Sequence, residues 1–227
     1  GFADATDKLT LAGHAEIKTD SRISPGGEVV RLRLDPSSAN THGTASYNDK
    51  IFLENGFEAE YLMQFSEAVG GGADNLQFHV TQDKLATVTA QTSPDFVVTF
   101  DTSKNAWDPS HSGLGIHNNG INHSVDLTQI AGLPFTGGSL SNTGLSVPEY
   151  PVRVTYYPGD LDVWLGGVKI LSDYNVTLRR NEVLDADGKA YVSMVGTSGA
   201  NYENHDLLSW SLKTPGTDLT SGLIAHY

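Results

Sequence analysis

Short apolar runs, many of them β-branched or alternating with polar residues, recur along the whole chain, and turn-forming residues separate them. Such runs predict β-strands, because successive side chains of a strand point to opposite faces of its sheet. The sequence shows no long stripe with the 3.6-residue period of an amphipathic helix, and we expect short helical turns only at residues 128–131 and 175–180. The expected strands comprise residues 29–34, 43–47, 57–65, 76–81, 85–90, 96–101, 114–118, 152–157, 161–165, 191–196 and 206–212.

The turns between these runs indicate one continuous antiparallel fold. Gly159-Asp160, between the runs 152–157 and 161–165, is a hairpin signal. No linker, composition shift or internal repeat divides the 227 residues. We therefore expect a single domain over residues 1–227, an all-β sandwich of two large antiparallel sheets.

The charge balance narrows the choice of partners. The chain has 27 acidic and 14 basic residues, a net charge of −13, which disfavours nucleic acid and anionic membranes and favours divalent cations. No apolar run approaches the roughly 20 residues needed to cross a bilayer, so we expect no membrane insertion. Cysteine is absent, so no disulfide framework is possible.

Oxygen-bearing residues follow one predicted strand closely. Asp101 ends the apolar run 96–100, and Ser103, Asn105 and Asp108 come next. Calcium binds six to eight oxygen atoms at roughly 2.3–2.6 Å in irregular geometry, and such a loop can supply them. An ordinary Asp/Asn turn after a strand would have the same residues, and the sequence pattern leaves both interpretations open.

Several segments, taken together, resemble the L-type (legume-type) lectins. Residues 100–110 resemble the legume calcium loop, and residues 72–78 resemble the family's Ala-Asp-Gly-Leu-Ala-Phe segment. Residues 196–202 with 205–211 are similar to the last specificity loop and final strand, and residues 118–126 resemble the cargo lectins of the secretory pathway. The segments keep the family's order and span almost the whole chain. The resemblance implies a concanavalin A-like jelly-roll sandwich.

The resemblance also implies a calcium site. Asp101, Asn105 and Asp108 would bind the ion through their side chains, and Ser103 would bind it through its carbonyl group. Asp126 matches the Asp of the cargo lectins' His-Ser-x-Asp segment and would be a further or competing ligand. Calcium is thus the expected cofactor.

A carbohydrate site is implied beside the calcium site. Asp74 would accept hydrogen bonds from two sugar hydroxyls, and the Asn105 amide would donate one. Backbone N–H groups of the loop after the strand 191–196 would complete the site. The resemblance further implies a cis peptide bond between Ala73 and Asp74. The implied carbohydrate-binding residues are Asp74, Asn105, His123, Gly199, Ala200 and Asn201.

Two departures from the family pattern change the expected chemistry. Thr99 stands where legume lectins have the Glu that binds a transition metal, so we expect no manganese site. A second calcium ion shared by Asp101 and Asp108 is the alternative. Ser103 stands where an aromatic residue stacks on the sugar, so we expect a specificity different from the mannose/glucose pattern.

The resemblance favours a calcium-dependent, non-catalytic carbohydrate-binding module of a secreted or cell-surface adhesin, of bacterial type and part of a larger chain. Its partners would be cell-surface glycans or polysaccharides, and its location extracellular or at the cell surface. One alternative is a glycoside hydrolase on the same sandwich. Glu58 and Glu60 alternate on one strand, but the Glu-x-Asp-x-x-Glu motif of related glucanases is absent. Another alternative is a structural or protein-binding sandwich stabilised by calcium.

Overall fold

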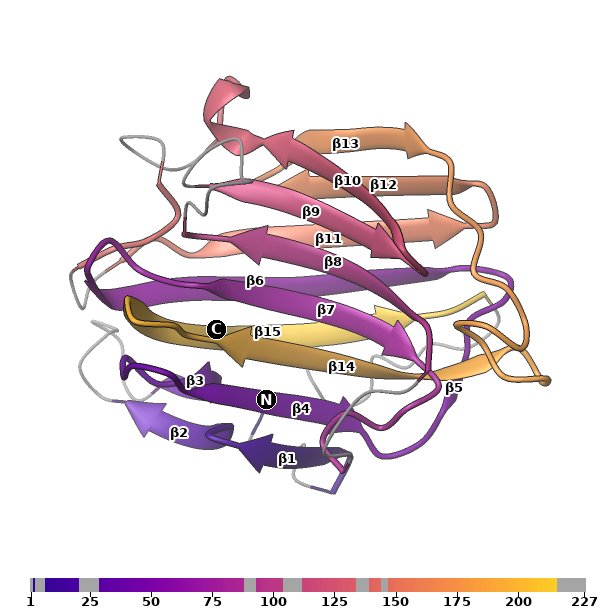
Figure 1. Ribbon diagram of the computed structural model, residues 1–227, viewed down its shortest axis with the longest axis horizontal. Coiled ribbons are helices and arrows are strands. Elements are labelled where there is room, and N and C mark those ends of the chain that lie inside the picture. Colours follow the sequence, from indigo (N-terminus) through magenta and orange to yellow (C-terminus); the bar gives the residue numbers. More distant parts are fainter. Residues whose placement is uncertain are drawn as a thin grey trace.

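Two antiparallel β-sheets lie face to face, and the strand axes of the two sheets are nearly aligned (Figure 1). The computed structural model describes residues 2, 7–20, 29–87, 93–103, 112–133, 139–143 and 147–215. This architecture is the all-β sandwich expected from the sequence.

Among the described residues, one sheet has eight strands and the other has seven. The order of the eight-stranded sheet is β1-β4-β14-β7-β8-β9-β10, and β5 pairs with β14. Its strands are β1 (Leu9–Gly13), β4 (His42–Tyr47), β5 (Ile51–Phe52), β7 (Asn75–Thr81), β8 (Asp95–Asp101), β9 (Gly113–Asn118), β10 (Ile121–Asp126) and β14 (Lys189–Thr197).

The seven-stranded sheet has the order β13-β12-β11-β6-β15-β3-β2. Its strands are β2 (Glu16–Asp20), β3 (Val29–Asp35), β6 (Phe57–Val69), β11 (Tyr150–Tyr157), β12 (Asp160–Leu165), β13 (Val168–Tyr174) and β15 (Tyr202–Lys213). A 3-10 turn, η2 (Leu127–Gln129), follows β10. No described helix has the length and apolar character needed to cross a lipid bilayer.

The core lies between the two sheets. It consists of the side chains of every second residue along the facing strands. Along β11 the inward positions are buried and the positions between them are more exposed. The ring of Phe57 on β6 lies 5.6 Å from that of Phe78 on β7 and 5.4 Å from that of Tyr156 on β11. Burying each such side chain contributes roughly 1.5–3 kcal/mol to folding. The apolar residues that alternate along the sequence are therefore the ones that pack between the sheets and stabilise the sandwich.

Most of the predicted strands are confirmed, and so is the β11–β12 hairpin, in which Tyr157 pairs with Asp160. Five strands were not predicted: β1, β2, β5, β10 and β13. Strand β10 shows why, since its central residues are Asn122, His123 and Ser124. It lies at a sheet edge and takes its backbone hydrogen bonds from β9, so it needs no strong apolar alternation.

Two predicted elements are wrong. Leu85–Ala90 is not a strand: Leu85 to Thr87 form a turn, in which the Ala86 N–H donates to Ser46 Oγ at 3.0 Å, and residues 88–90 lie outside the described residues. Residues 175–180 form no helical turn: residues 175–179 have no regular secondary structure, and Arg180 forms an isolated bridge with Leu184. Their alternate residues Val176 and Leu178 are buried, a spacing that differs from the helical period.

Strand ends from both sheets meet at one end of the sandwich, on the left in Figure 1. Strands β3, β6, β8 and β14 end there, and β4, β7, β9 and β15 begin there. Antiparallel pairing thus brings together loops that are distant in sequence, and the residues predicted to bind ligand are concentrated in these loops.

Candidate functional site

A row of directly opposed residues crosses the end of the eight-stranded sheet. Thr197 pairs with Asn75, Asn75 with Asp101, Asp101 with Gly113, and Gly113 with Asp126. Directly opposed residues share one face of a sheet. Asp101 and Asp126 therefore lie on the same face, and glycine is the only residue between them in the row.

Both of these carboxylates are anchored by nearby donors. The Oδ1 atom of Asp101 accepts a hydrogen bond from the Ser103 N–H at 2.8 Å, which fixes the backbone just after β8. The Oδ1 atom of Asp126 accepts from the Thr128 N–H at 2.9 Å and caps η2. Carboxylate oxygens of this kind are the hard donors that calcium prefers, so the described part of the donor set fits this ion. Asn105 and Asp108 lie outside the described residues.

The peptide bond between Ala73 and Asp74 is cis, as predicted. Three contacts hold this dipeptide. The Asp74 N–H donates to the Thr197 carbonyl at 2.7 Å, and the Asp74 carbonyl accepts from the Thr102 N–H at 2.9 Å. The Ala73 carbonyl accepts from Ser198 Oγ at 3.2 Å. The backbone at Asp74 is therefore fixed from the β8 side and from the β14 side.

The Asp74 carboxylate lies against the loop between β14 and β15. A Cβ atom added at Gly199 would lie 3.0 Å from Asp74 Oδ2, so only glycine allows this close approach without a shift. The Gly199 carbonyl accepts from the Asn40 N–H at 2.9 Å, which holds the loop in place. Burial raises the pKa of Asp74; the imidazole of His205 opposes this shift, and the Asp35 carboxylate adds to it. Asp74 is thus a half-buried acid at the centre of several loops.

Ala200 and Asn201 lie exposed on the same loop. The Asn201 side chain contacts the glycine-rich turn after β6: a Cβ atom at Gly70 would lie 2.1 Å from Asn201 Oδ1. Gly70 also has φ +71°, a left-handed conformation that favours glycine. The structure therefore brings Asp74, Gly199 and their loop neighbours together, as the sequence analysis expected.

His123 lies apart from these residues. It pairs with Ile116, whose side chain is 2% exposed, and therefore shares the inner face of the sheet, opposite to the face of Asp126. Its imidazole stacks on Tyr174 of β13, with the ring centroids 4.8 Å apart. In this structure the His123 ring therefore connects the edges of the two sheets, on the opposite face of the eight-stranded sheet from Asp126.

Three buried ionisable residues beneath Asp74 escaped the sequence analysis. Asp35, Glu203 and His205 each have 0% exposure. Their positions near strand ends, among polar neighbours, resemble a solvated surface, and the only available signal was the repeated polar residues at the start of β15. The His205 side chain lies between the two carboxylates, at 3.6 Å from Asp35 and 3.7 Å from Glu203.

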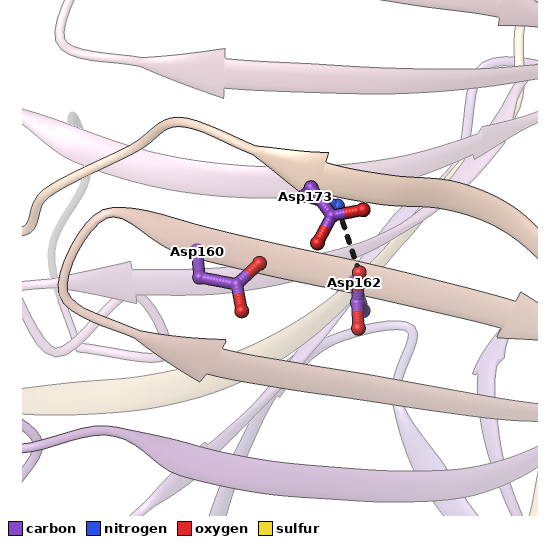
Figure 2. A group of neighbouring side chains, drawn as sticks. All are labelled: Asp160, Asp162 and Asp173. Atoms are coloured by element: carbon purple, nitrogen blue, oxygen red, sulfur yellow. Dashed lines mark hydrogen bonds between the residues drawn. The ribbon is translucent and has the colours of Figure 1, made fainter.

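A separate acidic group lies on the β12–β13 hairpin, where Asp160, Asp162 and Asp173 have ligand atoms within 4.8 Å of one another (Figure 2). The Asp162 carboxylate accepts from the Asp173 N–H at 2.9 Å, drawn as the dashed line, and from the Lys169 ammonium at 2.7 Å. The Lys169 ammonium partly neutralises the three carboxylates, and the hydrogen bond from the Asp173 N–H to Asp162 orders the hairpin. We therefore assign it a structural role.

Comparison with known proteins gives no match among protein-family models or among curated proteins. Solved structures do match over nearly the whole chain. Metal-free lectin I-B4 from Griffonia simplicifolia has a TM-score of 0.64 at 21% identity, covering 94% of this chain and 96% of that one. Lectin UEA-II complexed with galactose has a TM-score of 0.62 at 18% identity, covering 91% and 92%.

The exoplasmic/lumenal domain of VIP36, bound to Ca²⁺ and Man3GlcNAc, matches with a TM-score of 0.60 at 15% identity, covering 95% of this chain and 92% of that one. The chain has the L-type lectin fold. Identities this low establish the fold of the chain, and the function has to be argued from the geometry of its own residues.

Proposed function

We propose that this protein is a calcium-dependent, non-catalytic carbohydrate-binding module. A single domain over residues 1–227 would act as part of a larger secreted or cell-surface adhesin. Its glycan partners would lie outside the cell or on a cell surface. The observation that carries the proposal is the Asp74 carboxylate, half-buried and pressed against Gly199 at the loop end of an L-type lectin fold. Structures with this fold have been solved with galactose and with Man3GlcNAc bound.

Asp74 has the chemistry to anchor a neutral sugar. A carboxylate accepts short hydrogen bonds from hydroxyl groups, and such charge-assisted bonds are about twice as strong as neutral ones. Gly199 contributes no side chain, so a ligand hydroxyl can approach the carboxylate beside it. The exposed residues Ala200 and Asn201 would offer backbone N–H groups at the rim of the same site, with Asn105 as the further donor. We leave His123 out of this site because its ring lies on Tyr174.

Calcium would be held next to this site by Asp101 and the Ser103 carbonyl, with Asn105 and Asp108, and with Asp126 as a further ligand. The bound ion would supply a fixed positive charge that neutralises these carboxylates and orders their loop. Ordering the loop before the sugar arrives lowers the entropic cost of binding. The Thr102 N–H, which donates to the Asp74 carbonyl, would pass this order to the sugar-binding residue.

Glycoside hydrolysis is less well supported. Glu58 and Glu60 point to the outer face of the seven-stranded sheet, and both bind the Lys213 ammonium, at 3.3 and 3.5 Å. The two carboxylates raise the pKa of Lys213, as expected for a surface ion pair. Hydrolysis would instead need one protonated carboxyl group and one ionised group facing a bound sugar.

A glycan array probed with and without chelator tests the proposal. We expect glycan binding in millimolar calcium, its loss in EDTA, and its loss in the Asp74→Asn variant. The Asp160→Asn variant removes an exposed acid from the distant hairpin and should bind as the wild type does. Binding by Asp74→Asn equal to that of the wild type would refute the assigned anchor. An array without hits in calcium would favour the structural or protein-binding alternative.

A further inference from the structure

The Ala73–Asp74 dipeptide is held by two hydroxyl groups, each of which also binds a buried carboxylate. The Thr102 hydroxyl donates to Glu203 and lies 3.2 Å from the Asp74 carbonyl. The Ser198 hydroxyl donates to Asp35 and lies 3.2 Å from the Ala73 carbonyl. The two arms are equivalent in chemistry but come from opposite sides of the dipeptide.

Both carboxylates face the same imidazole. His205 Nδ1 lies 3.6 Å from Asp35 Oδ2, and His205 Nε2 lies 3.7 Å from Glu203 Oε1. All three side chains are fully buried, and the His205 ring also packs edge-on against Phe65 at 5.4 Å. Buried charged groups are costly unless they are paired or hydrogen-bonded. The charge pairing therefore favours an arrangement in which the imidazole stays between the two carboxylates.

Glu203 reaches further than the other members of the cluster. Its Oε1 atom also accepts from Ser141 Oγ at 3.0 Å, and a Cβ atom at Gly72 would lie 2.9 Å from Glu203 Cδ. Glu203 thus contacts the turn that leads into Asp74, the loop at Ser141 and the residue after Asp101. Burial raises the pKa of Glu203, while the Thr102 and Ser141 hydrogen bonds and His205 favour its ionised form.

We propose that Glu203, together with His205 and Asp35, positions the ligand-binding residue Asp74 from below without touching the ligand. Thr102 and Ser198 transmit the position of the two carboxylates to the Asp74 backbone. The inference rests on the proposed sugar-binding role of Asp74, and it adds residues that act through Asp74. Glu203 is the central one, because it also contacts the residue that follows the calcium-binding Asp101.

Amide hydrogen exchange, followed by NMR without any ligand, tests the positioning directly. The reporters are the N–H groups of Asp74 and Thr102, which donate to the Thr197 and Asp74 carbonyls. Glu203→Ala removes the carboxylate that the Thr102 and Ser141 hydroxyls share as acceptor, and we expect exchange at both amides to increase at least about tenfold. Glu203→Gln keeps an acceptor oxygen for both hydroxyls and should restore most of the protection.

Ser193→Ala is the matched control, because it removes an equally buried hydroxyl contact, 2.7 Å from Ser46, away from Asp74. It should lower the melting temperature and leave both reporter amides protected. Should Glu203→Ala not fold, Ser141→Ala removes one of the same hydrogen bonds and should give a smaller increase at both amides. An increase confined to Thr102, or an equal increase in the control, would overturn the inference.

Glycan affinity then separates this inference from the proposed function. If the wild type binds a glycan on the array, Glu203→Ala should weaken that binding about tenfold, and Glu203→Gln should weaken it much less. Unchanged affinity in Glu203→Ala would overturn the link to ligand binding. If the wild type binds no glycan, the proposed function fails, and the exchange measurements still decide whether Glu203 positions Asp74.

Discussion

The contact between Gly199 and Asp74 gives the sharpest test of the proposed site. Gly199→Ala adds one methyl group whose carbon would lie 3.0 Å from Asp74 Oδ2. Few real Cβ atoms come so close to a neighbour, so the carboxylate has to move by a few tenths of an ångström. The backbone at this position does not have positive φ, so alanine adds no strain of its own. The substitution therefore displaces the carboxylate of the proposed sugar anchor, Asp74, and changes little else.

The expected loss follows from the hydrogen bonds at stake. A hydrogen bond to a charged group contributes about 1.5–3 kcal/mol, and every 1.4 kcal/mol corresponds to about tenfold in affinity. Losing one of the two bonds that Asp74 is proposed to make to sugar hydroxyls should weaken binding about 10- to 100-fold. Isothermal titration with a glycan found on the array, in millimolar calcium, measures this loss.

Gly115→Ala is the matched control for this substitution. Its Cβ atom would lie 3.5 Å from Thr99 Cβ, an ordinary van der Waals contact, and Gly115 also lacks positive φ. We expect this variant to bind glycan as the wild type does. Both variants should keep melting temperatures close to that of the wild type. Wild-type affinity in Gly199→Ala would refute the reasoning, because the carboxylate would then not be the group that binds.

The remaining predictions concern the calcium ion, the effect of pH on Asp74, and His123 at the sheet edge. Asp101→Ala should lower the melting temperature in millimolar calcium to the value of the wild type in EDTA, because an ion bound only by the folded state stabilises that state. A calcium-dependent melting temperature in the variant would exclude Asp101 as a ligand. Because the pKa of Asp74 is raised, glycan affinity should fall as the pH drops through that raised pKa, and the fall should begin above the pH expected for an ordinary aspartate. A pKa of Asp74 that is higher in the folded than in the unfolded state means that ionised Asp74 lowers the free energy of unfolding near neutral pH. Asp74→Asn should therefore melt no lower than the wild type in scanning calorimetry. A clear drop in the melting temperature would contradict this. His123→Ala should lose the stacking on Tyr174 and melt slightly lower, with no change in glycan affinity by titration; weaker binding would restore His123 to the site.

The strands that were predicted correctly are those whose alternation is strong enough to decide the backbone locally. In β11 the inward residues are large and apolar, and Gly159 follows to allow the turn into β12. Strand β10 was missed because an edge strand is stabilised by its pairing with β9, which leaves no mark in its own residues. Residues 175–180 were mistaken for a helical turn because the burial of Val176 and Leu178 depends on the sheet beneath them.

The site divides in the same way. Asp74, Asp101 and Gly199 were predicted as site residues from the sequence, because each stands in a segment that resembles the lectin family. The contact between Ser198 and the Ala73 carbonyl was not predicted, because the two residues are 125 positions apart and only the folded sheets bring their loops together. Glu203 and His205 were missed for a related reason, because a buried charge and a surface charge look alike in a sequence.

The sequence by itself determined that the chain forms a β-sandwich and which short segments carry oxygen ligands, because strand alternation and turn chemistry act over a few residues. The family resemblance grouped these segments into one expected site, and only the tertiary structure decided how their residues contact one another. It placed Gly199 against Asp74, left His123 at the sheet edge and buried Asp35, Glu203 and His205 beneath the loops. The physical reason is that antiparallel pairing fixes neighbours through hydrogen bonds between distant strands, and those contacts depend on the whole fold.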